Sequence, residues 1–321
     1  MNGDKTNLGG FRPRRDLLPF LIAATILFLI ARGKDWEAVT AALAGVNLPL
    51  FLVGAGGYVL CYYLVTAFCY GLAYGFFVPG IRLRKLYTAF GASLLPQAVF
   101  PSLGQGLFLL YMVKKQRVSL FKALGVHVFI MVNDLGVMAA VVGLALFLLP
   151  EPPKIFILWF GLLALGLALT LIYARLGGRL LLFPRLHASN FMLALRTGSA
   201  RQFGGFFAAR LGWQAMQIFF HSLALAAIGI TAPLGMTGVL VLLMSLTSVL
   251  PIAALGFGGP NLVAEFFAPW VAAGKSPSET AFAYGLLFQT VFLAGRLVIG
   301  IIFALPIWRE IFRPDASLQS K

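Results

Sequence analysis

The sequence has few charged residues for its length. Only 11% of its 321 residues are Asp, Glu, Lys or Arg, whereas 60% are hydrophobic. The longest polar connection, residues 175–202, is itself half apolar. A soluble domain carries about 25% charged residues, so this chain has no room for a soluble catalytic domain. The scarcity of charge indicates a membrane protein.

Cysteine is also scarce. Cys61 and Cys69 are the only two cysteines, and they lie in one apolar block. We interpret them as helix-packing residues, because neither a disulfide framework nor a metal site is suggested. The sequence shows no nucleotide-binding loop, no zinc-ligand spacing and no Ser/His/Asp constellation. We therefore expect no cofactor, no metal and no enzymatic activity.

Long apolar runs recur along the whole chain. A helix needs about 20 apolar residues to span a bilayer, and the residue-by-residue alternation typical of outer-membrane barrels does not occur. The first run follows Arg14-Arg15 and superficially resembles a signal peptide or twin-arginine signal. It lacks the small-x-small pattern of a cleavage site, so we interpret it as a membrane helix that stays in the protein. The predicted fold is an all-α polytopic membrane protein. Spanning helices are expected at residues 17–31, 48–78, 120–149, 155–174, 203–230 and 280–305.

Two further apolar runs, 86–113 and 237–272, each contain a cluster of prolines and glycines. The clusters read LLPQAVFPSLGQG, residues 94–106, and VLPIAALGFGGPN, residues 249–261. Broken backbone at membrane depth is tolerated only where protein buries it or water lines it. We therefore predict two re-entrant helical hairpins with these clusters at their tips. The tip residues are Pro96, Pro101, Gly104 and Gly106 in the first hairpin, and Pro251, Gly256, Gly258 and Gly259 in the second.

The distribution of basic residues favours this topology. With both runs as re-entrant hairpins, 19 lysines and arginines fall on the cytoplasmic side and 4 on the other side, in accord with the positive-inside rule. If 86–113 crossed the membrane once, the basic loop 175–201 would face outward. We expect a multi-pass protein of the bacterial cytoplasmic membrane, with residues 1–16 and 306–321 in the cytoplasm. The net charge of +15 is then explained by basic residues in the cytoplasmic loops, so no nucleic-acid partner is expected.

The two hairpins divide the chain into matching halves. Leu95-Pro96 matches Leu250-Pro251 at an offset of 155 residues, and Gly104 matches Gly259 at the same offset. Each half runs helix, helix, hairpin, helix, and the two halves have opposite orientations. Inverted repeats with broken helices at corresponding positions are typical of transporters. The repeats are expected at residues 17–149, with hairpin 86–113, and at residues 155–305, with hairpin 237–272.

These motifs resemble a known family of membrane proteins. Leu250-Pro251 followed by Gly256-Phe257-Gly258-Gly259, together with Leu95-Pro96, Gly104 and a helix carrying Asp134, is similar to the transmembrane region of lysylphosphatidylglycerol synthase. This region is also called the flippase-like or multiple peptide resistance factor membrane domain. The resemblance covers about residues 15–306. It implies movement of a lipid or lipid-linked headgroup between leaflets.

The chain departs from the family pattern at three places. Ile130 and Met131 stand where the family often has a Glu-Arg pair. Asn261 stands where a Glu is usual, with Glu265 one turn further on, and Gln289 stands where an arginine is common. The resemblance therefore implies a divergent member and leaves its substrate open. We include Asn261, Glu265 and Gln289 among the candidate substrate-binding residues.

Few ionisable residues fall within the predicted membrane segments. A charge at the bilayer centre costs about 2.5–3.5 kcal/mol on insertion scales, so each one calls for a partner or a wet cavity. His127 and Asp134 lie seven residues apart and therefore share one helix face. The embedded set is His127, Asp134, Arg210, His221, Glu265 and Arg296.

The two embedded arginines are candidates for binding a phosphate headgroup. A planar guanidinium meets phosphate oxygens bidentately. We expect Arg210 and Arg296 near the hairpin tips, with Asp134 and Glu265 pairing with them when no lipid is bound, or carrying a proton. The simpler alternatives are that Arg210 snorkels to the cytoplasmic surface and that Glu265 is solvated near the outer surface.

A polar stripe follows from the spacing within segment 203–230. Arg210, Gln214, Gln217 and His221 recur at intervals of 4, 3 and 4 residues, which places them on one helix face. Such a stripe should face protein or water. His127 and His221 could form a proton relay, because histidine titrates near neutral pH; the alternative is that both are packing residues.

The sequence favours a flippase-like protein that moves an anionic phospholipid or lipid-linked headgroup between leaflets in envelope lipid biosynthesis. One alternative is a secondary transporter of a small anionic or amphiphilic solute. Others are a non-catalytic partner of an envelope-biosynthesis complex and a membrane transferase with Asp134 and His127 as its acid/base pair. The flippase-like reading predicts that the two hairpin tips approach each other near Asp134 and Arg296.

Overall fold

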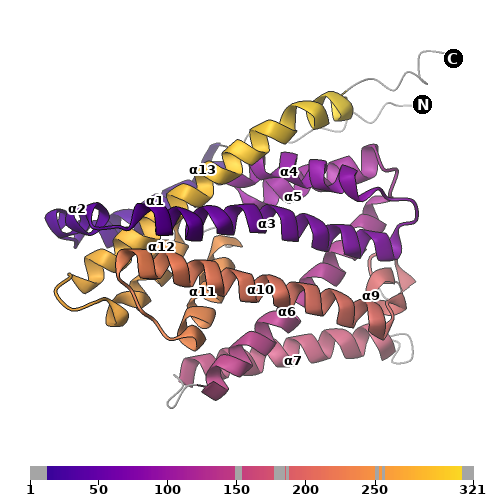
Figure 1. Ribbon diagram of the computed structural model, residues 1–321. Coiled ribbons are helices and arrows are strands. Elements are labelled where there is room, and N and C mark those ends of the chain that lie inside the picture. Colours follow the sequence, from indigo (N-terminus) through magenta and orange to yellow (C-terminus); the bar gives the residue numbers. More distant parts are fainter. Residues whose placement is uncertain are drawn as a thin grey trace.

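The computed structural model describes residues 13–148, 154–176, 185, 188–249, 253–254 and 257–312. Helices make up almost all of this part (Figure 1). In chain order the elements are α1 (Pro13–Arg32), α2 (Trp36–Ala44), α3 (Leu48–Phe77), α4 (Leu83–Val99), α5 (Pro101–Lys114), α6 (Leu120–Leu148), α7 (Lys154–Leu176), α9 (Leu193–Thr197), α10 (Ala200–Ile228), α11 (Leu234–Val249), β1 (Ala253–Ala254), β2 (Phe257–Gly258), α12 (Gly259–Ala264), the 3-10 helix η1 (Glu265–Trp270) and α13 (Pro277–Phe312).

The helices have the length and surface of membrane spans. Helices α3, α6, α10 and α13 each contain a stretch long and apolar enough to cross a bilayer, and shorter apolar stretches lie in α1, α7 and α11. Large apolar side chains remain exposed, such as Leu165 and Leu169 on α7 and Ile301 and Ile302 on α13. Exposed apolar surface of this extent marks an interaction surface, which is consistent with helices embedded in a membrane. The predicted class, an all-α membrane protein, is confirmed at this level.

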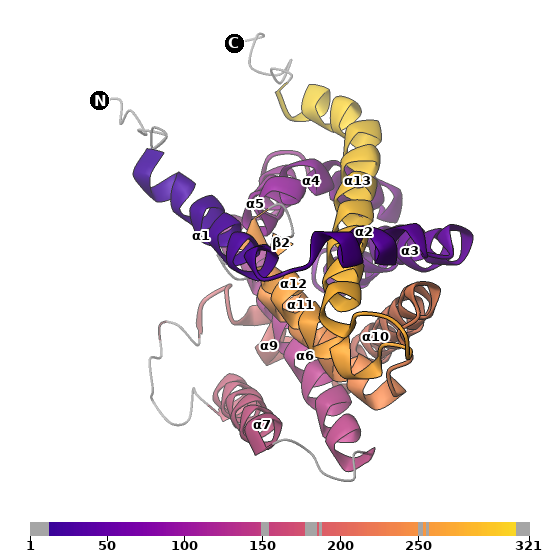
Figure 2. The ribbon, with the colours of Figure 1, turned by 90° about the vertical axis from the view of Figure 1, so that its left-hand side faces the viewer.

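Helices α3 and α10 pack closely against each other and run antiparallel (Figure 1). Their close approach depends on Gly54, where a Cβ atom would lie 2.7 Å from the backbone nitrogen of Ala224. Helix α10 begins at a capping box formed by Ser199 and Gln202, and it ends at Gly229, which has a φ of 87°. Only glycine adopts that angle without strain. Helix α7, by contrast, lies at the periphery against α6 (Figure 2).

The first proline/glycine cluster forms a helical hairpin. Helices α4 and α5 pack against each other and are joined at Phe100, which is extended at φ −143° and ψ 132°. A residue before a proline is pushed out of the helical region, so Pro101 explains why the chain reverses there. Pro96 lies inside α4. Gly104 lets the arms meet, because its Cβ would lie 2.5 Å from the carbonyl oxygen of Ser93; nothing lies within 4 Å of a Cβ at Gly106.

The second cluster forms a different turn. Helix α11 leads into the antiparallel pair β1–β2, in which Ala253 faces Gly258, and the return arm consists of the short helices α12 and η1. Gly258 has a φ of 91°, which excludes most other residues, and Gly259 begins α12. The predicted helical hairpin therefore contains a short antiparallel strand pair near its tip. Pro251 and Gly256 lie outside the described residues.

The two ends of this second segment meet. The backbone N–H of Thr231 donates to the carbonyl of Trp270, and that of Ala272 donates to the carbonyl of Gly229, both at 2.9 Å. The chain thus enters α11 and leaves η1 at the same end of the molecule, the end at which α2 also lies (Figure 1).

Candidate functional site

A cavity of about 250 Å³ lies among helices α3, α4, α5, α6, α10, α11 and α13. Helices from both predicted halves contribute to its lining. Seven of the site residues predicted from the sequence line it: Asp134, Arg210, Gln214, Gln217, His221, Gln289 and Arg296.

The polar stripe of α10 faces this cavity over its whole length. Gln214, Gln217 and His221 are each less than one-tenth exposed, and Arg210 continues the same face. The Oε1 atom of Gln217 accepts from Ser245 of α11 at 3.4 Å. The stripe therefore faces the interior of the bundle, in accord with the prediction that it faces protein or water.

Arg210 and Asp134 form a bidentate ion pair between α10 and α6. Nε of Arg210 donates to Oδ1 of Asp134, and Nη2 donates to Oδ2 at 2.8 Å. Both side chains line the cavity. The predicted pairing of Asp134 with an embedded arginine is confirmed, and the snorkelling alternative for Arg210 is wrong.

Arg296 has no carboxylate partner within the part of the chain that the structure describes. The residue is 5% exposed on α13. Its Nη1 donates to the carbonyl oxygen of Gln97 at 3.2 Å, and its guanidinium lies 4.3 Å from the ring centroid of Phe292. Its Nε and Nη2 atoms are buried and have no hydrogen-bond partner among the described residues. A buried cation with unused donors is costly unless a ligand or water meets them.

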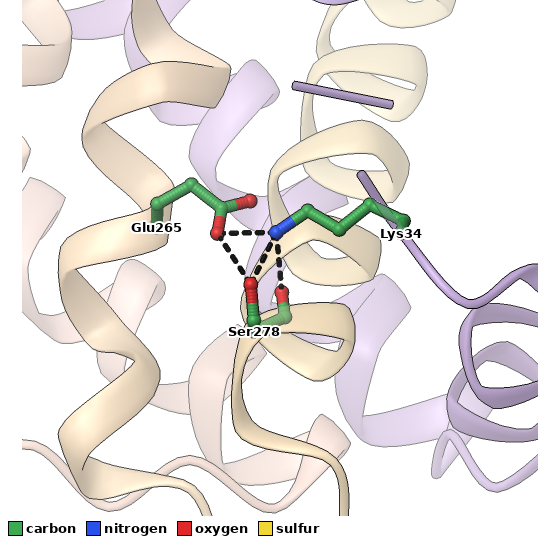
Figure 3. Close-up of polar contacts among 3 residues, drawn as sticks. All are labelled: Lys34, Glu265 and Ser278. Carbon is green, nitrogen blue, oxygen red and sulfur yellow. Dashed lines mark hydrogen bonds and ion pairs between the residues drawn. The ribbon is translucent and has the colours of Figure 1, made fainter. Parts of the chain in front are cut away.

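Glu265 lies elsewhere, which corrects the prediction that it would pair with an embedded arginine. It accepts from Nζ of Lys34 at 2.6 Å and from Oγ of Ser278 at 3.0 Å, and Lys34 also donates to Ser278 (Figure 3). The Lys34 side chain is only 8% exposed. This cluster connects the α1–α2 loop with η1 and the first turn of α13. The Glu265 side chain is 22% exposed, bonds to Lys34 and Ser278, and lies outside the cavity lining, so we assign it a structural role.

Replacing Glu265 with glutamine should lower the free energy of unfolding by about 2 kcal/mol, because the buried ammonium of Lys34 would lose its counter-charge. Binding of inorganic phosphate, measured by isothermal titration calorimetry in detergent, should not change. Glu279→Gln is the control: this acid lies in the same first turn of α13 and has no ion pair among the described residues. A loss of phosphate binding in Glu265→Gln would contradict the structural assignment.

Two other predicted residues also lie outside the cavity lining. The Oδ1 atom of Asn261 accepts from the backbone N–H of Gly258 at 3.3 Å and so stabilises the turn before α12. His127 has its Nδ1 atom 3.2 Å from the hydroxyl of Tyr74, and its ring packs edge-on against Tyr70. His221 does line the cavity, with Nδ1 2.5 Å from the hydroxyl of Tyr284. The two histidines therefore have different surroundings and form no common site.

Among the described residues, the first hairpin tip reaches the site and β1–β2 of the second does not. Gln97, next to the reversal at Phe100, contacts Arg296 and lines the cavity together with Gln105 of α5. The second segment contributes Met244 and Ser245 of α11 instead, while β1 and β2 contact α1. The first tip therefore lies at Arg296, as predicted. The described residues of the second tip do not line the cavity, so the predicted meeting of the two tips is not found among the described residues.

Several residues that line the cavity were not predicted as site residues from the sequence. Tyr58, Tyr62, Thr66 and Tyr70 line the cavity from α3 at intervals of four residues. That spacing is as regular as the stripe of α10, and it is visible in the sequence. Aromatic residues are common in membrane helices, however, so the spacing of these α3 residues does not by itself indicate a binding site.

The described residues contain no group of three or more His, Cys, Asp or Glu side chains placed to hold a metal ion. The site is instead a polar cavity with one neutralised and one unneutralised arginine. The chain matches none of the protein-family models and none of the curated proteins with which it was compared.

Proposed function

We propose that the protein binds the anionic headgroup of a membrane lipid in this cavity and moves it between leaflets, as a flippase-like protein. The observation that carries the proposal is the guanidinium of Arg296, buried in the cavity with two nitrogens unpartnered among the described residues. A phosphate offers several acceptor oxygens and a negative charge, and it would meet both nitrogens at once.

The charge of the cavity supports an anion. Asp134 and Arg210 have opposite charges and neutralise each other. Arg296 therefore leaves an excess of one positive charge among the arginines and carboxylates of the described lining. Bound phosphate would offset that excess inside an apolar bundle, where an uncompensated charge is expensive.

The hairpins fit this role if they are re-entrant. We propose that α4–α5 and α11–η1 form the two re-entrant hairpins of an inverted repeat, in a bacterial cytoplasmic membrane with both termini in the cytoplasm. The support is the reversal at Phe100, the adjacent ends of the second segment, and the resemblance of both motifs to the lysylphosphatidylglycerol synthase transmembrane region. A broken helix leaves backbone carbonyls and N–H groups free to bond near a substrate. The carbonyl of Gln97 is such a group, and it accepts a hydrogen bond from Arg296.

A secondary transporter of a small anionic solute is the second candidate. Its support is the size of the cavity, about 250 Å³, which is below the roughly 300–1,000 Å³ of typical ligand pockets. A headgroup or a small solute fits this space, whereas acyl chains would have to stay outside it in the bilayer.

The two candidates are separated by reconstitution. Purified protein is placed in liposomes containing phosphatidylglycerol or phosphatidic acid labelled on the acyl chain near the headgroup, and a membrane-impermeant quencher is added outside. We expect quenching to pass the plateau of empty liposomes, because inner-leaflet lipid becomes accessible. A plateau equal to that of empty liposomes, together with uptake of radiolabelled phosphate or organic anions, would favour the solute transporter instead.

A further inference from the structure

The cavity holds an unusual concentration of neutral amides. Five of the eight glutamines in the sequence line it, namely Gln97, Gln105, Gln214, Gln217 and Gln289. A glutamine amide donates two hydrogen bonds and accepts two. Nε2 of Gln214 is buried without a partner among the described residues, whereas Oε1 of Gln97 accepts from Tyr62 and Oε1 of Gln217 accepts from Ser245. Buried amides are rarely left unpaired, so the cavity is built for a ligand with several hydrogen-bonding groups.

Aromatic faces adjoin the amides. The rings of Tyr58, Tyr62, Trp213 and Phe292 lie near one another, with Tyr58 and Trp213 5.7 Å apart and Tyr62 and Phe292 5.3 Å apart between centroids. The face of an aromatic ring is electron-rich, and the C–H bonds on one side of a sugar or cyclic polyol ring are weakly positive. Hydroxyl groups, which both donate and accept, complement amides. Aromatic faces combined with neutral amides therefore suit a polyhydroxylated ring.

The same lining disfavours a positively charged headgroup. Among the described lining residues the only carboxylate is that of Asp134, and Arg210 already holds both of its oxygens. An aminoacyl ammonium would have no free anion to meet and would face the charge of Arg296. This electrostatic pattern selects against aminoacylated lipids.

We infer that the ligand is a phosphorylated sugar or cyclic polyol, with its phosphate on Arg296 and its hydroxyl groups on the glutamine amides. This inference rests on the proposed function and names the headgroup class. The shared chemistry has two sources, a lipid with such a headgroup and a free sugar phosphate, so the test includes both.

Binding to the purified protein in detergent is measured by isothermal titration calorimetry with four probes. They are short-chain phosphatidylinositol, short-chain phosphatidic acid, glucose 1-phosphate and inorganic phosphate. We expect phosphatidylinositol to bind at least about tenfold more tightly than phosphatidic acid, since each added neutral hydrogen bond contributes roughly a factor of five. Tighter binding of glucose 1-phosphate than of inorganic phosphate would assign the same chemistry to a free ligand.

Variants that remove one amide at a time show which glutamines cause the preference for phosphatidylinositol. Gln214→Leu and Gln289→Leu should each weaken phosphatidylinositol binding about fivefold more than they weaken phosphatidic acid binding. Gln116→Leu is the matched control, because Gln116 bonds to Tyr111 outside the cavity lining. Equal affinity of the wild-type protein for phosphatidylinositol and phosphatidic acid would overturn the inference without any variant. If phosphatidic acid then still bound through Arg296, the proposed function would stand and only the headgroup class would be wrong.

Discussion

Arg296→Gln is expected to slow lipid translocation in proteoliposomes by about 10- to 100-fold. A hydrogen bond to a charged group contributes about 1.5–3 kcal/mol, and each 1.4 kcal/mol is a factor of ten. Glutamine keeps a polar side chain toward the carbonyl of Gln97 but removes the charge that would hold phosphate. The measurement is the initial rate of quenching of labelled inner-leaflet lipid at matched protein density.

The stability of this variant separates function from folding. The wild-type guanidinium is buried with two unpartnered nitrogens among the described residues, so its removal relieves an uncompensated charge. We expect the thermal unfolding temperature of Arg296→Gln to stay the same or rise while transport falls. Arg309→Gln is the control: Arg309 lies on the same helix but is exposed, and its loss should change neither quantity. Wild-type transport by Arg296→Gln would refute the proposed role of this residue.

The Asp134–Arg210 pair should contribute the largest single coupling energy to stability. In Asp134→Asn the arginine stays in the bundle without its counter-charge, and we expect a loss of about 3 kcal/mol in the free energy of unfolding. The double variant Asp134→Asn/Arg210→Gln replaces the ion pair with two neutral amides. It should recover most of that loss, since breaking a buried pair costs more than replacing it.

A surface pair provides the comparison for this double-mutant cycle. Lys85 and Glu310 lie 3.8 Å apart, with side chains 47% and 42% exposed. Exposed pairs contribute roughly 0–1 kcal/mol, so the same cycle there should give a coupling energy below about 1 kcal/mol. Denaturation in detergent micelles measures both cycles. Equal coupling energies at the two sites would show that the cavity pair is as hydrated as a surface pair.

Much of the architecture could be predicted because its causes are local. Apolar runs long enough to span a bilayer must satisfy their backbone internally and so become helices; all six predicted spans coincide with helices of the structure. The reversal at Phe100 follows from the proline after it. The stripe from Arg210 to His221 follows from helical spacing, which places its members on one face in any helix.

The pairing of charged groups could not be predicted in the same way. Arg210 meets Asp134 across 76 residues of sequence, Arg296 meets Gln97 across 199, and Lys34 meets Glu265 across 231. By sequence, Lys34 is one of the four lysines and arginines expected on the non-cytoplasmic side, and nothing in the α1–α2 connection indicates its partner. The expectation that each embedded acid would neutralise an embedded arginine was right for Asp134 and wrong for Glu265.

The sequence by itself determined the membrane class, the helices, the first chain reversal and the polar faces, since each depends on composition or on neighbours within a few turns. Only the tertiary structure decided which polar groups share one cavity and which arginine is left without a carboxylate. The physical reason is that helical periodicity fixes the direction of a side chain on its own helix, whereas its partner depends on how distant helices pack. The packing of α13 against α4 brings Arg296 to Gln97, away from Glu265, and leaves the positive charge on which the proposed function rests.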